Sequence, residues 1–176
     1  MEQAPVRDSQ RQRLYDAEQQ VRRQLELAAA GARTVTVGSS TIVLPLEVRF
    51  GSMQAVQRYS DAVRATAAFQ QRFPHAAAAS LRVRARRGDR HAHYEAPDMI
   101  ALHQPEHGSA WALRELVVLH EVAHHAAHHD LPPEPAHGAG YAGAFLRVVT
   151  DAMGPEAGLL LTSAFADHGV AFTPIP

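Results

Sequence analysis

One uninterrupted stretch constrains the fold more than any other part of the sequence. Residues 110–129 contain neither glycine nor proline, and their apolar side chains spread over a broad part of a helix surface. Such a helix is stable only when other elements of the protein cover it. We therefore expect residues 110–129 to form a helix in the centre of the molecule, ended by Pro132 and Pro133.

Strands are expected mainly before this central helix. β-Branched runs on both sides of a short polar turn predict a β-hairpin over residues 34–44, and period-two alternation predicts a strand over 81–86 with a turn at 87–90. Short strands are also expected at 91–94 and 98–103, and helices at 7–30, 52–70, 138–153 and 155–169. Strands in the first half and helices in the second indicate an α+β fold.

The length of 176 residues fits a single domain with a short extension. Residues 1–31 contain a segment in which apolar residues recur at helical spacing, and we treat it as an N-terminal amphipathic helix. Residues 32–176 then form the domain itself.

Charge and hydropathy argue against two classes of partner. The net charge is −1, so no overall field attracts nucleic acid or an anionic membrane. Three arginines, Arg82, Arg84 and Arg86, share one strand face, which we expect to face solvent rather than a phosphate backbone. No apolar stretch reaches the ~20 residues of a membrane helix, and residues 1–24 show no signal-peptide pattern. These features predict a soluble, cytoplasmic protein without membrane or nucleic-acid partners.

Histidine and cysteine usage restricts the metal chemistry that the chain can perform. The sequence contains no cysteine, which excludes disulfides and thiolate metal sites. It contains 12 histidines, and they concentrate between His91 and His137. Any transition metal would therefore be held by imidazole and carboxylate groups.

The central helix carries the pattern HExxH, formed by His120, Glu121 and His124. Four residues make just over one helical turn, so the two imidazoles project from the same face and can share a metal ion. Zinc accepts nitrogen ligands and keeps a position for water when the protein supplies three ligands. Glu121 lies about 100° around the helix from His120, where it can take a proton from that water. The pattern predicts a zinc site with Glu121 as the general base.

A third ligand is expected downstream of the motif. His137 follows His124 across a proline-rich turn that can bring the next helix back to the metal. Asp130 is the alternative, at the position that compact zinc proteases use after a glycine turn. Here Ala127 replaces that glycine, which favours His137 over Asp130. Glu134 is a further, weaker alternative.

The sequence resembles a family of HExxH zinc hydrolases from actinobacteria. The resemblance rests on residues 91–102, 116–125, 137–138 and 154–157, and it extends over about residues 45–170. An HExxH helix followed by a His-Gly pair is also similar to the SprT-like zinc proteases. The cysteine-based zinc ribbon of that group is absent here, which speaks against a role linked to nucleic acid.

The resemblance implies both a fold and a set of roles. It implies that His120, His124 and His137 bind Zn²⁺ and that Glu121 is catalytic. It also implies a zincin-like fold, in which a small, mostly antiparallel sheet packs on the HExxH helix and further helices follow. Residues 98–103 are the candidate for an edge strand that aligns an extended peptide.

The function expected from these features is zinc-dependent hydrolysis, with a peptide or protein as the substrate. Two other functions stay open. One is a regulatory or structural zinc-binding module without turnover, and the other is a metal-free helical interaction protein. The substrate, the oligomeric state and the physiological metal do not follow from the sequence.

Overall fold

The computed structural model describes residues 8–86, 92–103 and 113–176. Within these ranges the chain forms helices and two small sheets, which confirms the α+β class. The helices are α1 (Arg11–Ala29), α2 (Met53–Arg64), α3 (Ala67–Arg72), α4 (Pro74–Ala78), α5 (Glu115–Asp130), α6 (Ala139–Met153) and α7 (Pro155–His168). The strands are β1 (Thr34–Val37), β2 (Ser40–Val43), β3 (Arg82–Arg86), β4 (His93–Glu95) and β5 (Met99–His103).

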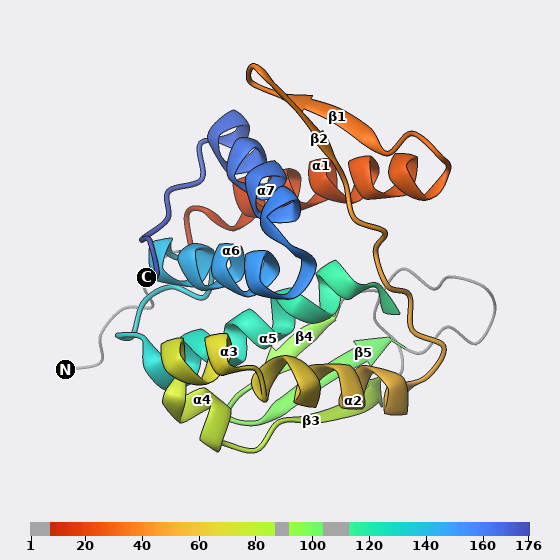
Figure 1. The fold of residues 1–176 in the computed structure, drawn as a ribbon. Coiled ribbons are helices and arrows are strands. Elements are labelled where there is room, and N and C mark those ends of the chain that lie inside the picture. The colour runs from red at the N-terminus through yellow and green to blue at the C-terminus, as the bar shows by residue number, and fades with distance from the viewer. Residues whose placement is uncertain (1–7, 87–91, 104–112) are drawn as a thin grey trace.

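Helix α5 lies in the middle of the molecule, as the sequence predicts (Figure 1). The sheet of β3, β4 and β5 lies on one side of it and α6 on the other, followed by α7 and α1 (Figure 1). The fully buried apolar residues of α5 are Leu116, Val118, Leu119, Val122, Ala123 and Ala126. The helix begins at Glu115 rather than at residue 110, and residues 110–112 lie outside the described ranges.

The three-stranded sheet is mixed rather than mostly antiparallel. Its order is β3-β5-β4, with β3 parallel and β4 antiparallel to β5. Strand β5 is the most apolar of the three, with Ile100, Ala101 and Leu102 fully buried, so it occupies the centre. The strand expected at 98–103 forms, but the prediction that it is an edge strand is wrong. The edge strand next to α5 is β4. Strands β3 and β4 do not pair with each other, and the turn expected at 87–90 lies outside the described residues.

The other predicted elements differ mainly at their ends. The hairpin of β1 and β2 forms, with Thr34 opposite Val43. The helix predicted over residues 52–70 divides in two, because the Thr66 hydroxyl accepts a hydrogen bond from the Phe69 N–H and starts a new helix, α3. Pro74 does not close this segment but begins α4, at the first-turn position that proline favours.

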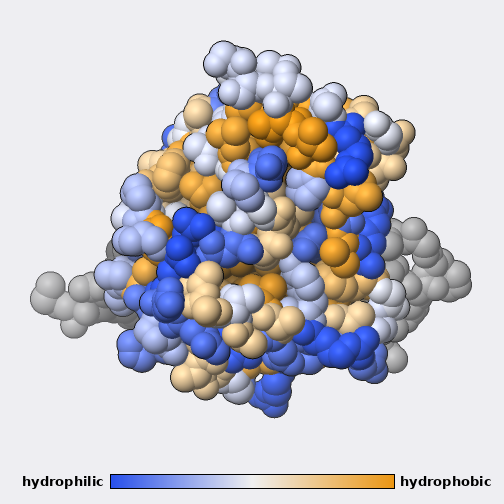
Figure 2. Space-filling view, viewed as in Figure 1, coloured by the Kyte–Doolittle hydropathy of each residue, from blue (hydrophilic) through white to orange (hydrophobic). Residues whose placement is uncertain are grey.

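Helix α1 packs against α7, and the apolar residues that recur at helical spacing in this segment are buried, among them Leu14, Val21, Leu25 and Ala28. The division of the chain at residue 31 stays a prediction. No helix in the described ranges is long and apolar enough to cross a membrane. Figure 2 shows polar and apolar residues intermixed on one face of the molecule, with apolar surface directly beneath the tip of the hairpin.

Candidate metal centre

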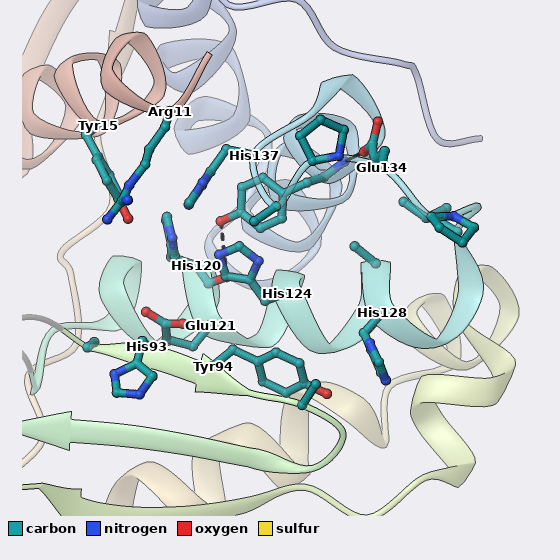
Figure 3. Close-up of a pocket in the computed structure, with 18 of the residues that line it drawn as sticks. Arg11, Tyr15, His93, Tyr94, His120, Glu121, His124, His128, Glu134 and His137 are labelled. Carbon is teal, nitrogen blue, oxygen red and sulfur yellow. Dashed lines mark hydrogen bonds between the residues drawn. The ribbon is translucent and has the colours of Figure 1, made fainter. Parts of the chain in front are cut away.

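Three histidines from two parts of the chain meet in one cluster. His120 and His124 project from α5, and His137 lies in the turn directly before α6. One ring nitrogen of each lies within 4.8 Å of the others (Figure 3). Nitrogens bound tetrahedrally at zinc distances lie roughly 3.3 Å apart, so small side-chain rotations would close the cluster. The structure thus brings together the three residues that the sequence singles out as ligands.

His137 reaches the cluster because the turn after α5 is fixed by Glu134. The Glu134 carboxylate accepts a hydrogen bond from the Tyr141 N–H at 2.6 Å, which holds it over the first turn of α6. A Cβ at position 138 would lie 2.5 Å from Glu134 Oε2, so a larger residue there would push this carboxylate aside. Glu134 is thereby engaged as a helix cap, and it is not in the cluster that the described residues form.

Asp130 also has a structural role in this arrangement. Its carboxylate accepts hydrogen bonds from the N–H groups of His75 and Ala76, at 3.1 and 2.8 Å, and contacts His75 Nδ1 at 2.8 Å. It therefore caps the first turn of α4. Among the described residues, the alternative third ligand is thus not part of the histidine cluster.

The chemistry of the three imidazoles fits a divalent metal. The Nδ1 atom of His137 lies 2.7 Å from Asp8 Oδ2, while its Nε2 is buried and has no hydrogen-bond partner among the described residues. His120 Nδ1 lies 3.0 Å from Glu18 Oε2, although their relative orientation falls short of ordinary hydrogen-bond geometry. In both residues the other ring nitrogen is left for a ligand. A carboxylate on one nitrogen and a metal on the other is the usual environment of a metal-bound histidine.

Burial decides the charge of two of these imidazoles. Burial lowers the pKa of His124 well below its ordinary value, and the neighbouring His120 and His137 lower it further. Burial likewise lowers the pKa of His137, although Asp8 opposes the change. Both rings are therefore neutral at neutral pH, as metal ligands have to be. For His120, burial would lower the pKa, but the Glu18 carboxylate raises it above the ordinary value.

Glu121 lies in the same site with a buried carboxylate that is only partly compensated. The residue is 3% exposed, and its Oε2 has no hydrogen-bond partner among the described residues. Burial raises the pKa of Glu121 to about 7, against the opposing effect of His120 and a backbone hydrogen bond from Tyr94. A carboxyl group with this pKa can both accept and release a proton near neutral pH.

A pocket of about 600 Å³ gives access to the cluster and to Glu121. Its walls come from α5, from the turn after α5, from β4 through His93 and Tyr94, and from α1 through Arg11 and Tyr15 (Figure 3). Arg11 lies 5.4 Å from the centre of the Tyr15 ring. The edge strand and the N-terminal helix therefore both contribute to the walls of the site.

Two further aromatic and histidine side chains pack the base of the site. Tyr141 is buried, its hydroxyl donates to the backbone carbonyl of His120 at 3.2 Å, and its ring stacks on His124 at 4.1 Å between centroids. His125 is buried behind the cluster, with Nε2 3.0 Å from the carbonyl of Ala76 and Nδ1 3.2 Å from the Tyr94 hydroxyl. These contacts tie α5 to its neighbours, and of the two residues only Tyr141 also lines the pocket.

The sequence analysis missed the contribution of the N-terminal segment. Asp8, Arg11, Tyr15 and Glu18 are spaced by three, four and three residues, the repeat of one helix face, and all four lie at or near the cluster. The signal was present in the sequence, since Glu18 falls beside the apolar stripe of α1. This signal can be interpreted only when the side chains of α1 are known to reach His120 and His137.

Comparisons with models of protein families, with curated proteins and with solved structures found no match. The resemblance suggested by the motifs therefore stays a prediction, and the function has to be argued from the geometry of the site.

Proposed function

We propose that this protein is a zinc-dependent hydrolase that cleaves peptide bonds. The observation that carries the proposal is the cluster of His120, His124 and His137 with Glu121 in the same pocket. The unpartnered Nε2 of His137 and the raised pKa of Glu121 support it, because both are unfavourable in a protein without a ligand.

The three imidazoles would hold the ion through one nitrogen each. A zinc ion bound there would supply a Lewis acid that acidifies a water molecule and polarises a carbonyl group. Glu121 accepts the proton of the attacking water at its carboxylate and passes it to the leaving amine. Its pKa of about 7 suits both halves of this transfer.

The edge strand β4 supports a peptide as the substrate. Among the described residues β5 is the strand that pairs with it, which leaves its other edge unpaired within those ranges, and His93 and Tyr94 line the pocket. Glu121 lines the same pocket as these two residues, so the strand and the base border the same space. An extended chain that adds to β4 would pass Glu121. We infer a zincin-like arrangement from this sheet, its edge strand and the HExxH helix.

The main alternative is a zinc-binding module without turnover. Structural zinc sites are closed by four protein ligands, whereas catalytic sites keep one position open. Here the described residues supply three imidazoles, and the cluster borders a pocket of about 600 Å³. This arrangement favours the hydrolase. The proposal keeps the cytoplasm as the location, which cell fractionation would test.

The test combines metal content with cleavage. Elemental mass spectrometry of the untagged protein should find about one zinc per chain, and far less in His120→Ala and His137→Ala. The zinc-loaded protein is then incubated with a peptide library that is read by mass spectrometry, with Glu121→Gln as the control. We expect cleavage by the wild type and none by Glu121→Gln, which should keep its zinc. Equal zinc contents in all variants would refute the metal site, and zinc without cleavage of any peptide would favour the non-catalytic module.

A further inference from the structure

The N-terminal segment contacts two of the three clustered histidines. Asp8 Oδ2 lies 2.7 Å from His137 Nδ1, and the Gln10 side chain donates to the His137 carbonyl at 3.0 Å. Ten residues after Asp8, Glu18 Oε2 lies 3.0 Å from His120 Nδ1. Both the ring and the backbone of His137 are thus held by residues that precede or begin α1.

The burial of the Glu18 carboxylate is energetically unfavourable. Its side chain is 5% exposed and lies beside the buried apolar stripe of α1. A carboxylate in such a place costs several kcal/mol of desolvation unless a charged or polar partner compensates it. His120 is the partner within ion-pair distance among the described residues. A leucine at this position would pack the helix without that cost, so packing alone does not explain the carboxylate.

The two contacts are made to the same ring nitrogen. Asp8 hydrogen-bonds to Nδ1 of His137, and Glu18 lies within ion-pair distance of Nδ1 of His120, outside ordinary hydrogen-bond geometry. A carboxylate beside Nδ1 favours the proton on that nitrogen and leaves the lone pair on Nε2. In His137 this Nε2 is the buried nitrogen without a hydrogen-bond partner in the described ranges. His124 differs, because its ring is held by stacking on Tyr141.

We propose that Asp8 and Glu18 are positioning residues of the metal centre, which orient His137 and His120 so that both present Nε2 to one divalent ion. The N-terminal segment is then a structural part of a site whose ligands all lie beyond residue 119. This inference rests on the metal site of the proposed function and does not depend on hydrolysis.

The experiment removes each carboxylate charge without changing the shape of the side chain. Zinc affinity is measured by competition with a chromogenic chelator for the wild type, Asp8→Asn and Glu18→Gln. The control is Asp16→Asn, on the same helix, whose carboxylate accepts a hydrogen bond from Gln12 at an exposed site. We expect each of the two variants to bind zinc roughly 10- to 100-fold more weakly, and the control to equal the wild type.

A second readout separates orientation of the ligands from general stability. The visible absorption spectrum of the cobalt-substituted protein reports the ligand geometry, and it should change in Asp8→Asn and Glu18→Gln but not in Asp16→Asn. Wild-type affinity and an unchanged spectrum in both variants would overturn the inference while leaving the metal site intact. A wild type that binds no zinc would overturn the proposed function as well. If Glu18→Gln fails to fold, Asp8→Asn decides, because the Asp8 side chain is 25% exposed and tolerates substitution.

Discussion

The carboxylate of Glu121 opposes folding at the place where function is expected. It is almost completely buried, and the surroundings raise its pKa from the ordinary 4.5 to about 7. This difference corresponds to roughly 3 kcal/mol of preference for the neutral form in the folded state. The protein thus retains a buried carboxylate although a neutral residue would avoid this cost, which is typical of functional sites.

Replacing Glu121 by Gln should therefore stabilise the metal-free protein while abolishing hydrolysis. We expect the free energy of unfolding to rise by roughly 1–3 kcal/mol at about pH 8, less than the full electrostatic difference because burial of the polar amide also costs free energy. Urea denaturation after chelator treatment measures it, with Asp16→Asn as the control. A loss of stability in Glu121→Gln would show that the carboxylate has a stabilising partner.

The stabilisation should depend on pH in a defined direction. The folded pKa of Glu121 is raised, so between pH 4.5 and about 7 the folded state binds more protons at this residue than the unfolded state. The destabilisation by Glu121 therefore grows as pH rises through this window and is complete above it. The difference in unfolding free energy between Glu121→Gln and the wild type should be largest at about pH 8 and smallest at about pH 5. A difference that does not change with pH would contradict the buried, only partly compensated carboxylate.

Asp130 and His137 should respond differently to substitution. Asp130→Ala removes the cap of α4, and we expect a loss of about 1–2 kcal/mol of stability with unchanged zinc affinity. His137→Ala should instead reduce zinc affinity severely. Urea denaturation and chelator competition on both variants measure the two effects separately. Loss of zinc from Asp130→Ala alone would make Asp130 the third ligand.

At the scale of elements, sequence patterns predict the features that depend on contacts between nearby residues. The spacing of His120 and His124 on one helix and the hairpin over residues 34–44 follow from contacts within a few residues, and both are present. The order β3-β5-β4 depends on which strand is buried in the finished fold, so alternation within each strand could not reveal it. The carboxylates that contact the histidines could not be predicted for the same reason, because Asp8 precedes α1, Glu18 lies in it, and both are more than a hundred residues away in the sequence.

Helix α6 offers a prediction at this scale. It passes so close to the C-terminal segment that a Cβ at Gly143 would lie 1.8 Å from the carbonyl oxygen of Thr173. Gly143→Ala would gain about 1 kcal/mol of helix propensity, but the backbone contact forces the segment away from α6. We expect a net loss of about 1–3 kcal/mol in urea denaturation. Gly51→Ala is the matched control, because no atom lies within 4 Å of its added Cβ. Equal stabilities of both variants would contradict the close approach.

At the scale of the whole molecule, metal binding and folding should be linked. The clustered residues belong to α5 and to the turn before α6, and α1 supports them, so an unfolded chain cannot offer the site. Zinc at a hundred times its dissociation constant should add about 2.7 kcal/mol of stability, or roughly 5–10 °C in the melting temperature. Thermal unfolding with zinc or chelator measures this, and His120→Ala should show no such difference. A wild-type melting temperature that does not change on addition of zinc would argue against the metal site.

The contact between Asp8 and His137 also has a consequence for biosynthesis. The two residues are 129 positions apart, and Glu18 likewise precedes His120 by more than a hundred. A ribosome therefore makes the carboxylates long before the imidazoles, and neither group can orient the other until the intervening chain has left the exit tunnel and collapsed. Metal loading in the finished geometry becomes a late event, and a loaded molecule is one that has already completed its longest-range contacts.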